Sequence, residues 1–132
     1  MPDAPQWKNM VIFDANMILR YLLRDNESMA NQAKQYLIAG NVTVTIEVIA
    51  EVVYVLQGIY DMERQEVADK AMRLLQLVDC RDYDILPLAI RTYAEQNLDF
   101  VDCILYAYNK ICGFEIATFD KKLLRLINSE VI

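Results

Sequence analysis

Short apolar runs alternate with segments of helical periodicity along this chain, and that alternation restricts the fold more than any other feature. The run 9–14 is apolar and ends on Asp14, and hydrophobic residues then recur at helical spacing over 18–23. Residues 42–45 are β-branched and favour a second strand. Strands that alternate with helices of this length are typically parallel and joined by right-handed crossovers. We therefore expect an α/β fold with three α/β/α layers and a small parallel central sheet.

The same signals predict the other elements. One helix is expected over 27–39, ended by Gly40, and another over 100–112, ended by Gly113. Asp61 is expected to cap a long helix whose apolar face extends to Val78. Further helices are expected at 46–56, 88–97 and 121–127, and further strands at 83–86, 115–118 and 131–132.

Length and charge limit the kind of protein this is. The chain has 132 residues, 55% of them hydrophobic, which suits one compact domain over 1–132. No charge-free stretch approaches the roughly eighteen residues that cross a bilayer, and residues 1–8 lack the pattern of a secretory signal. We expect a cytoplasmic protein without membrane association. The net charge of −6 means that a nucleic-acid substrate would require a local basic patch and metal ions.

The chain contains no histidine, and this limits its chemistry. Histidine is the usual general base, the partner in Ser-His-Asp and Cys-His nucleophile systems, and the commonest ligand of transition metals. The three cysteines show no paired spacing of the kind that binds zinc or forms a disulfide framework. Any hydrolysis must therefore use carboxylates.

Four acidic residues occupy positions where such chemistry would be expected. Ligands of an open parallel sheet bind beyond the carboxyl ends of its strands. Asp14 ends the first strand, Asp120 follows the strand expected at 115–118, and Asp102 lies in the first turn of the preceding helix. Glu51 lies between apolar neighbours in mid-helix, where burial without a partner would be expensive. Each has a structural explanation as a helix cap, a dipole partner or a solvated charge, but together they suggest a site for Mg²⁺ or Mn²⁺.

Four motifs in this order and spacing resemble those of PIN-domain nucleases. They are Val-Ile-Phe-Asp14-Ala-Asn16-Met-Ile-Leu-Arg, Ala-Glu51-Val-Val-Tyr-Val-Leu, Asp99-Phe-Val-Asp102-Cys-Ile-Leu and Ala-Thr118-Phe-Asp120-Lys. The resemblance covers nearly the whole chain and extends to the VapC-type toxins, which are small endoribonucleases of toxin–antitoxin pairs. One departure is Ala15, where many relatives have threonine.

The resemblance implies a role for each matching residue. The catalytic and metal-binding acids would be Asp14, Glu51, Asp102 and Asp120, with Asn16 and Thr118 as polar supporting residues. Asp99 is either a helix cap, which we favour, or an additional metal-shell group. Glu47 shares the helix face of Glu51 and is interpreted as a helix-start charge or a supporting residue.

The implied activity is that of a Mg²⁺- or Mn²⁺-dependent endoribonuclease in which a metal-activated water cleaves RNA. As a toxin, the protein would bind a cognate antitoxin, and such relatives commonly form homodimers. The candidate RNA-backbone contacts, which could equally be solvated helix faces, are Arg20, Arg24, Lys121, Lys122 and Arg125.

Other functions fit the sequence less well. A phosphate-accepting receiver has adjacent acids after its first strand, whereas Ala15 follows Asp14. A phosphatase of the haloacid dehalogenase type has Asp-x-Asp there, whereas this chain has Asn16. A catalytically inactive PIN-like binding module and a housekeeping RNA-processing nuclease remain alternatives to the toxin.

Overall fold

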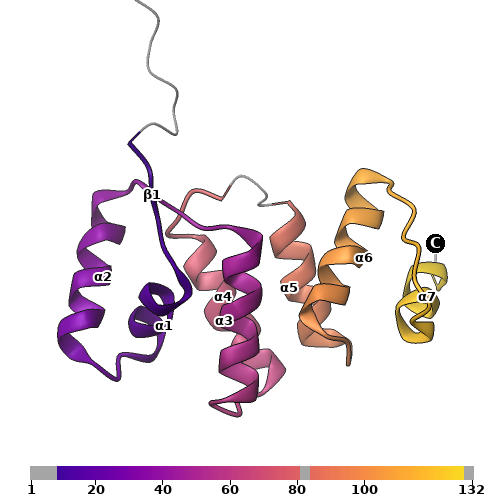
Figure 1. The fold of residues 1–132 in the computed structure, drawn as a ribbon, viewed down its shortest axis with the longest axis horizontal. Helices are drawn as coiled ribbons and strands as arrows, with labels where there is room; N and C mark the ends of the chain where they lie inside the picture. Colours follow the sequence, from indigo (N-terminus) through magenta and orange to yellow (C-terminus); the bar gives the residue numbers. More distant parts are fainter. Residues whose placement is uncertain (1–8, 81–83, 130–132) are drawn as a thin grey trace, which may run out of the picture.

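The computed structural model describes residues 9–80 and 84–129, which form a mostly helical structure with a small parallel sheet (Figure 1). Strands β1 (Val11–Ile12) and β2 (Val42–Thr43) pair in parallel, with Val11 opposite Val42. The Val11 and Phe13 amides donate to the carbonyls of Asn41 and Thr43, at 2.8 and 3.2 Å. A single parallel bridge between Thr43 and Asp79 extends the sheet on the side of β2.

Three helices lie close to this sheet. They are α1 (Ala15–Leu23), α2 (Glu27–Ala39) and α3 (Ile46–Gly58). Each begins at a residue whose side-chain oxygen accepts a hydrogen bond from a first-turn amide, and these capping residues are Asp14, Asn26 and Thr45. Such bonds satisfy amides that have no partner inside the helix, which explains why these helices start where they do.

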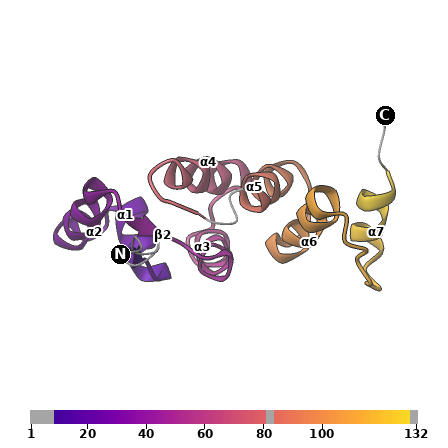
Figure 2. The same cartoon turned by 90° about the horizontal axis from the view of Figure 1, so that it is seen from above.

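The remaining helices continue along the long axis of the molecule. They are α4 (Arg64–Leu75), α5 (Ile85–Glu95), α6 (Phe100–Cys112) and α7 (Lys121–Asn128). Both views place α1 and α2 at one end and α7 at the other, with α6 next to α7 (Figures 1 and 2). Neither these helices nor the other described ones have the length and apolar character needed to cross a membrane.

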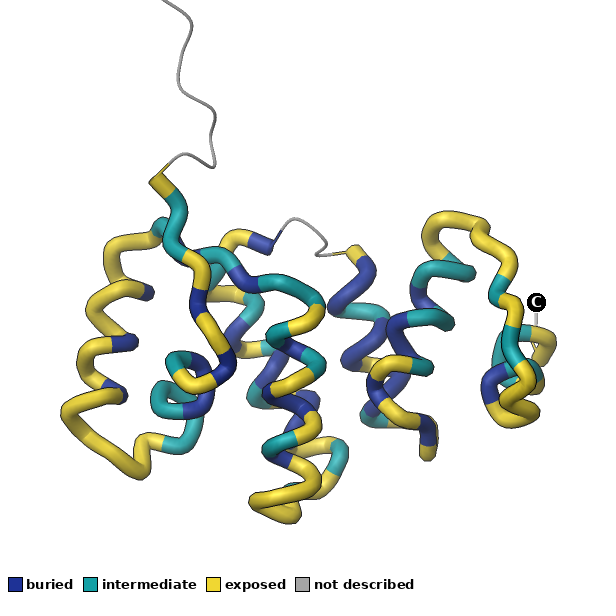
Figure 3. The backbone as a smooth tube through the Cα atoms, in the orientation of Figure 1, coloured by how far each residue is buried: buried dark blue, intermediate teal, exposed yellow. Residues whose placement is uncertain are grey.

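The buried apolar residues form a core between the helices, and Figure 3 shows where buried residues lie along the backbone. Phe13 and Ile18 bring the β1–α1 connection into this core, and both are fully inaccessible to solvent. Tyr93 of α5 packs edge-on against Phe100 of α6, with ring centroids 5.8 Å apart. The core therefore extends from the sheet to the start of α6, the helix that carries Asp102.

Most predicted helices are confirmed. Helices α2 and α6 have the predicted bounds. The predicted cap at Asp61 is wrong, because this residue has a positive φ of 54° and α4 begins after Glu63. The strand predicted at 83–86 is wrong at Ile85 and Leu86, which open α5, while residue 83 lies outside the described residues. Pro87 did not end a strand there, because proline is tolerated in the first turn of a helix.

The strand predicted at 115–118 is also absent. Residues 113–120 connect α6 to α7 without regular structure, and Phe119 is fully exposed. Strand propensity reflects the fit of a side chain to a neighbouring strand, and this segment has no neighbouring strand in the described structure. The strand predicted at 131–132 lies outside the described residues.

One side chain ties α4 to the connection between α5 and α6. The Arg64 guanidinium lies over the Tyr93 ring at 4.3 Å, and its Nη1 donates to the carbonyls of Tyr93, Gln96 and Leu98 at 3.0, 2.9 and 2.8 Å. The last carbonyl groups of a helix find no backbone N–H donor within that helix. Arg64 supplies the missing donors at the turn that precedes Asp99 and Asp102.

We predict that Arg64→Ala lowers the free energy of unfolding by about 2–4 kcal/mol, because it removes charge-assisted hydrogen bonds and a ring contact together. Urea denaturation followed by circular dichroism measures this loss. The control is Arg91→Ala on the exposed face of α5, which should stay within about 0.5 kcal/mol of wild type. An Arg64→Ala protein as stable as that control would contradict the assigned role.

Candidate metal centre

The first group of candidate residues lies where β1 leads into α1. Asp14 is exposed, and its Oδ1 accepts a hydrogen bond from the Met17 amide at 2.8 Å. Asn16 follows in the first turn and is also exposed. The buried Phe13 fixes the backbone immediately before Asp14. Asp14 is therefore a helix cap that also presents a carboxylate at the carboxyl end of the sheet.

The second position is on α3. Glu51 and Glu47 are both exposed, and Glu47 lies in the first turn, as expected of a helix-start charge. Their neighbours Val52 and Val53 are buried, so the apolar run around Glu51 faces the core while the glutamate faces solvent. The structure shows no desolvation of Glu51 that would require a charged partner.

A group of three aspartates lies at the starts of α6 and α7: Asp99 and Asp102 belong to α6, and Asp120 caps α7. Asp120 caps α7 by accepting a hydrogen bond from the Leu123 amide at 2.9 Å, and its own amide donates to Thr118 Oγ1 at 3.0 Å. Asp99 takes the predicted N-cap position of α6, although its side chain makes no capping bond. Asp102 lies in the first turn of α6 and is partly buried.

The negative charges in this group lie close enough together to affect the titration of Asp102. Burial raises the pKa of the Asp102 carboxyl, and the negative charges of Asp120 and then Asp99 raise it further. A partly buried acid beside other acids is a common feature of functional sites. This negative charge makes the start of α6 a candidate position for part of a cation site.

A thiol is not an alternative ligand at this place. Cys103 is adjacent to Asp102 but fully buried, and burial raises the pKa of its thiol to about 12. The thiol therefore stays protonated near neutral pH, and only thiolates bind metals or attack electrophiles. The available ligands are oxygen atoms, as Mg²⁺ and Mn²⁺ prefer.

The described part of the chain does not gather a complete set of metal ligands. Across residues 9–80 and 84–129, no three acidic or cysteine side chains are close enough together to hold a metal ion. Helix α3 and the start of α6 do share a cavity of about 260 Å³, lined by residues that include Ala50, Tyr54 and Asp99. The donor chemistry suits a hard cation, but the arrangement in a single chain does not gather the ligands.

The candidate RNA contacts differ in their availability. Arg20 is bound in an ion pair to Asp25 at 2.6 Å, and Lys122 Nζ donates to the Asn97 carbonyl at 2.7 Å. Lys121 and Arg125 on α7 are exposed. Arg24 is exposed and stacks over the Tyr21 ring at 5.3 Å.

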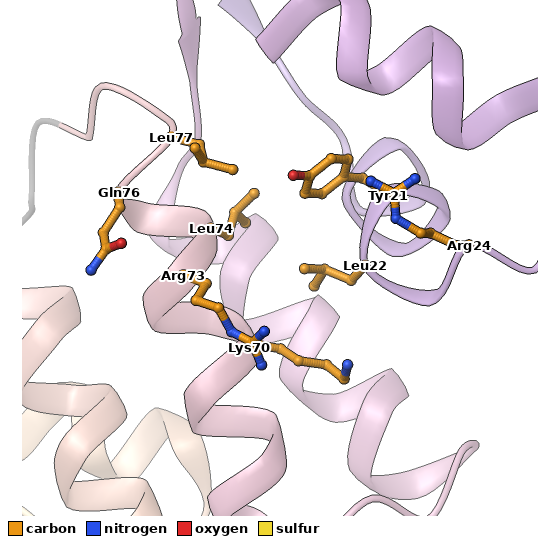
Figure 4. Close-up of a pocket in the computed structure, with 8 residues that line it drawn as sticks. All are labelled: Tyr21, Leu22, Arg24, Lys70, Arg73, Leu74, Gln76 and Leu77. Atoms are coloured by element: carbon orange, nitrogen blue, oxygen red, sulfur yellow. The ribbon is translucent and has the colours of Figure 1, made fainter. Parts of the chain in front are cut away.

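Arg24 also belongs to a basic pocket that the sequence did not reveal. This pocket of about 340 Å³ lies between α1 and α4, and Figure 4 shows Arg24 on one side with Lys70 and Arg73 on the other. None of its lining residues is acidic. Lys70 and Arg73 share a face of α4 at i,i+3 spacing, which the sequence shows, but their position opposite α1 depends on tertiary packing.

Comparison with known proteins identifies the family. The chain matches the PIN domain family over residues 11–128, so it belongs to that family. No curated protein and no solved structure matches the chain. The predicted α/β fold with a small parallel sheet is confirmed, and PIN domains are generally metal-dependent nucleases that act on nucleic acid.

We predict that Asp120→Asn lowers the pKa of Asp102 without returning it to its ordinary value, because burial is the larger cause of the shift. A carboxyl-carbon NMR titration measures this pKa directly. Glu51→Gln is the matched control and should leave the Asp102 titration unchanged, since Glu51 does not contribute to the shift. Equal effects of the two variants would contradict the grouping of Asp102 with Asp120.

The same shift predicts how stability depends on pH. Because the pKa of Asp102 is higher in the folded than in the unfolded protein, the folded state binds this proton more tightly, and that contribution is lost as pH rises through the folded pKa. Without metal, Asp102→Asn should therefore melt at or above the wild-type temperature at neutral pH and approach wild type in acid. Thermal melts at both pH values test this, and a lower neutral-pH melting temperature for Asp102→Asn would contradict it.

Proposed function

We propose that this PIN-domain protein is a Mg²⁺- or Mn²⁺-dependent endoribonuclease. Its catalytic and metal-binding residues would be Asp14, Glu51, Asp102 and Asp120, supported by Asn16, Thr118 and Asp99. The observation that carries the proposal is the raised pKa of Asp102 beside Asp120 and Asp99, within a chain of the PIN family. Acids that repel one another near a partly buried position favour the binding of a cation.

The residue types support oxygen-only coordination. The chain has no histidine, and the Cys103 thiol beside Asp102 stays protonated. A divalent ion held by the carboxylates would activate water and stabilise negative charge on the phosphate. The side chains themselves would bind and orient: Asp14 and Asp120 are fixed by their capping bonds, and Thr118 is fixed to Asp120.

The basic residues would bind the RNA backbone outside the acidic centre. A protein of net charge −6 repels RNA at long range, so local positive surface is needed. The pocket with Arg24, Lys70 and Arg73 offers three cations without a lining acid. Lys121 and Arg125 on α7 offer a second exposed pair beside Asp120 in sequence.

The biological role we propose is that of a cytoplasmic toxin in a toxin–antitoxin pair. This follows from the resemblance of the four acidic motifs to VapC-type toxins. The partners would be RNA, a cognate antitoxin and a second copy of the chain. A housekeeping ribonuclease would share the chemistry and differ only in these partners.

A catalytically inactive PIN-like binding module is the alternative that one observation favours. Among the described residues, no three acidic or cysteine side chains are close enough together to hold a metal ion. Such a module would use its acidic surface to hold a basic partner and would need no metal. Metal-dependent cleavage distinguishes the two functions.

We predict that the purified protein, freed of any partner, cleaves single-stranded RNA with Mg²⁺ or Mn²⁺ and loses this activity in excess EDTA. Gel assays on a labelled RNA measure cleavage. Asp14→Asn should reduce the rate by at least about 100-fold, because it removes a charge from the metal ligands while asparagine still caps α1. Robust cleavage in EDTA, absent from the Asp14→Asn preparation, would exclude the metal mechanism.

Expression of the chain alone should slow bacterial growth, and Asp14→Asn expressed to the same level should not. Growth curves with matched protein levels test the toxin role. If the wild-type chain cleaves RNA in vitro but is harmless in cells, the housekeeping alternative is favoured over the toxin.

A further inference from the structure

Three cations line one pocket, and no acid lines it with them. Arg24 at the end of α1 lies on one side of this pocket of about 340 Å³, and Lys70 and Arg73 of α4 lie on the other (Figure 4). Lys70 and Arg73 are neighbours on the helix surface, since side chains at i,i+3 spacing have their Cβ atoms about 5–6 Å apart. Like charges gathered in a pocket repel one another, and a bound anion would relieve that repulsion.

The acids nearest to these cations in the sequence are bound elsewhere. Asp25, which follows Arg24, forms an ion pair with Arg20 at 2.6 Å. Asp69 of α4 accepts a hydrogen bond from Gln65 Nε2 at 2.9 Å. Among the described residues, none of the three cations of the pocket forms an ion pair. Their charges are therefore available to a ligand.

Both arginines of the pocket are held in place and still have donors to offer. The Arg24 guanidinium lies over the Tyr21 ring at 5.3 Å. Arg73 Nε donates to the Asp69 carbonyl of its own helix at 3.4 Å, and its terminal nitrogens make no hydrogen bond within the described residues. A guanidinium whose position is already restricted loses less side-chain freedom on binding, and it can donate two parallel hydrogen bonds to one phosphate.

Arg24 also has an unusual backbone conformation. It ends α1 with a φ of 53°, in the left-handed region where glycine is the usual residue and residues with a Cβ are uncommon. Strained conformations of this kind cluster at functional sites. The chain has an arginine where glycine would fit more easily, and a binding role for the arginine charge accounts for this.

The rest of the pocket suits a ligand larger than a bare ion. Leu22 and Leu74 line it from the two helices, and Leu77, which is 44% exposed, adds apolar surface that is open to solvent. Gln76 supplies an amide that can both donate and accept hydrogen bonds. The volume of about 340 Å³ is that of a small-molecule site. Charged side chains beside apolar ones match a phosphate that is attached to a nucleoside.

We propose that this pocket binds the phosphomonoester group of a nucleotide, with the phosphate between Arg24 and the pair Lys70 and Arg73, and the nucleoside against the leucines. A phosphomonoester carries a charge of about −1.5 to −2 near pH 7, whereas each phosphate inside an RNA chain carries a single negative charge. Three cations in one pocket therefore favour a terminal phosphate over a backbone phosphate. Two sources offer this group, a free mononucleotide and the 5′-phosphate end of an RNA. The inference refines the RNA-backbone role proposed for this pocket, and it concerns binding alone.

Calorimetric titration in EDTA tests the ligand class, because without divalent ions the acidic residues cannot hold a phosphate through a metal. The probes form two pairs: adenosine 5′-monophosphate with adenosine, and a 5′-phosphorylated hexaadenylate with its 5′-hydroxyl form. A phosphorylated probe should bind at least about tenfold more tightly than its partner, since it adds charge-assisted hydrogen bonds. Equal affinities within both pairs overturn the proposal, and so does full displacement of the phosphorylated probe by an equal concentration of sulfate.

The same titrations distinguish the two sources of the phosphate. If adenosine 5′-monophosphate binds as tightly as the phosphorylated hexaadenylate, the site accepts free nucleotides. If the hexaadenylate binds about tenfold more tightly, the site recognises the phosphorylated end of an RNA.

Variants assign the binding to this pocket. Lys70→Gln should weaken binding of the phosphorylated probe about tenfold, whereas the matched control Lys34→Gln, which removes an exposed cation of α2, should leave the affinity unchanged. Arg24→Gly should weaken binding by a similar factor and melt no lower than wild type, because glycine adopts the positive φ without strain. Unchanged affinity in Lys70→Gln or Arg24→Gly, or an equal loss in Lys34→Gln, contradicts the proposal.

These binding measurements are independent of the proposed nuclease activity. If the phosphorylated probe binds at the pocket while the wild-type chain cleaves no RNA with Mg²⁺ or Mn²⁺, the phosphate site stands and the nuclease function fails. If RNA is cleaved but the terminal phosphate adds no affinity, the nuclease function stands and the phosphate site is overturned.

Discussion

The contact of Arg64 with the end of α5 is the interaction on which the position of the candidate site depends. One guanidinium nitrogen binds three carbonyls of the α5–α6 connection, while the group lies over the Tyr93 ring. Arginine is suited to this because its planar group can donate hydrogen bonds and stack on a ring together. The contact sets where α6 begins, and α6 carries Asp102 in its first turn.

Repulsion between carboxylates opposes the gathering of acidic side chains into one site. Two unit charges about 5 Å apart repel by roughly 3 kcal/mol at an effective dielectric near 20. Asp14 and Glu51 are exposed to solvent, which weakens the repulsion that their charges contribute. Asp102 shows the consequence of crowding, because burial and then the negative charges of Asp120 and Asp99 raise the pKa of its carboxyl.

The sequence predicted the elements whose ends depend on local chemistry. Helix α2 has the predicted bounds because Asn26 caps its start and Gly40, with a positive φ of 82°, ends it. The sequence failed where structure depends on distant partners. Residues 115–118 have the composition of a strand but pair with nothing in the described chain, and Ile85 and Leu86 joined a helix although their apolar run also fits a strand.

In the candidate site, too, the features set by local sequence were predicted and those set by tertiary packing were not. The acids were predicted from their positions after strands and at helix starts, and the capping bonds of Asp14 and Asp120 agree with those positions. The basic pocket of Arg24, Lys70 and Arg73 was not predicted, because its lining residues come from segments that are far apart in the sequence and lie opposite one another only in the folded chain.

Paramagnetic NMR with Mn²⁺ tests the central claim most directly, because the ion broadens the signals of nuclei around its binding site. The account predicts that substoichiometric Mn²⁺ broadens the signals of Asp14, Glu51, Asp102 and Asp120 together, while those of Lys70 and Arg73 in the basic pocket remain sharp. Broadening confined to one acidic group, or spread over exposed acids such as Glu27 and Glu66, would contradict a single metal centre built from these four residues.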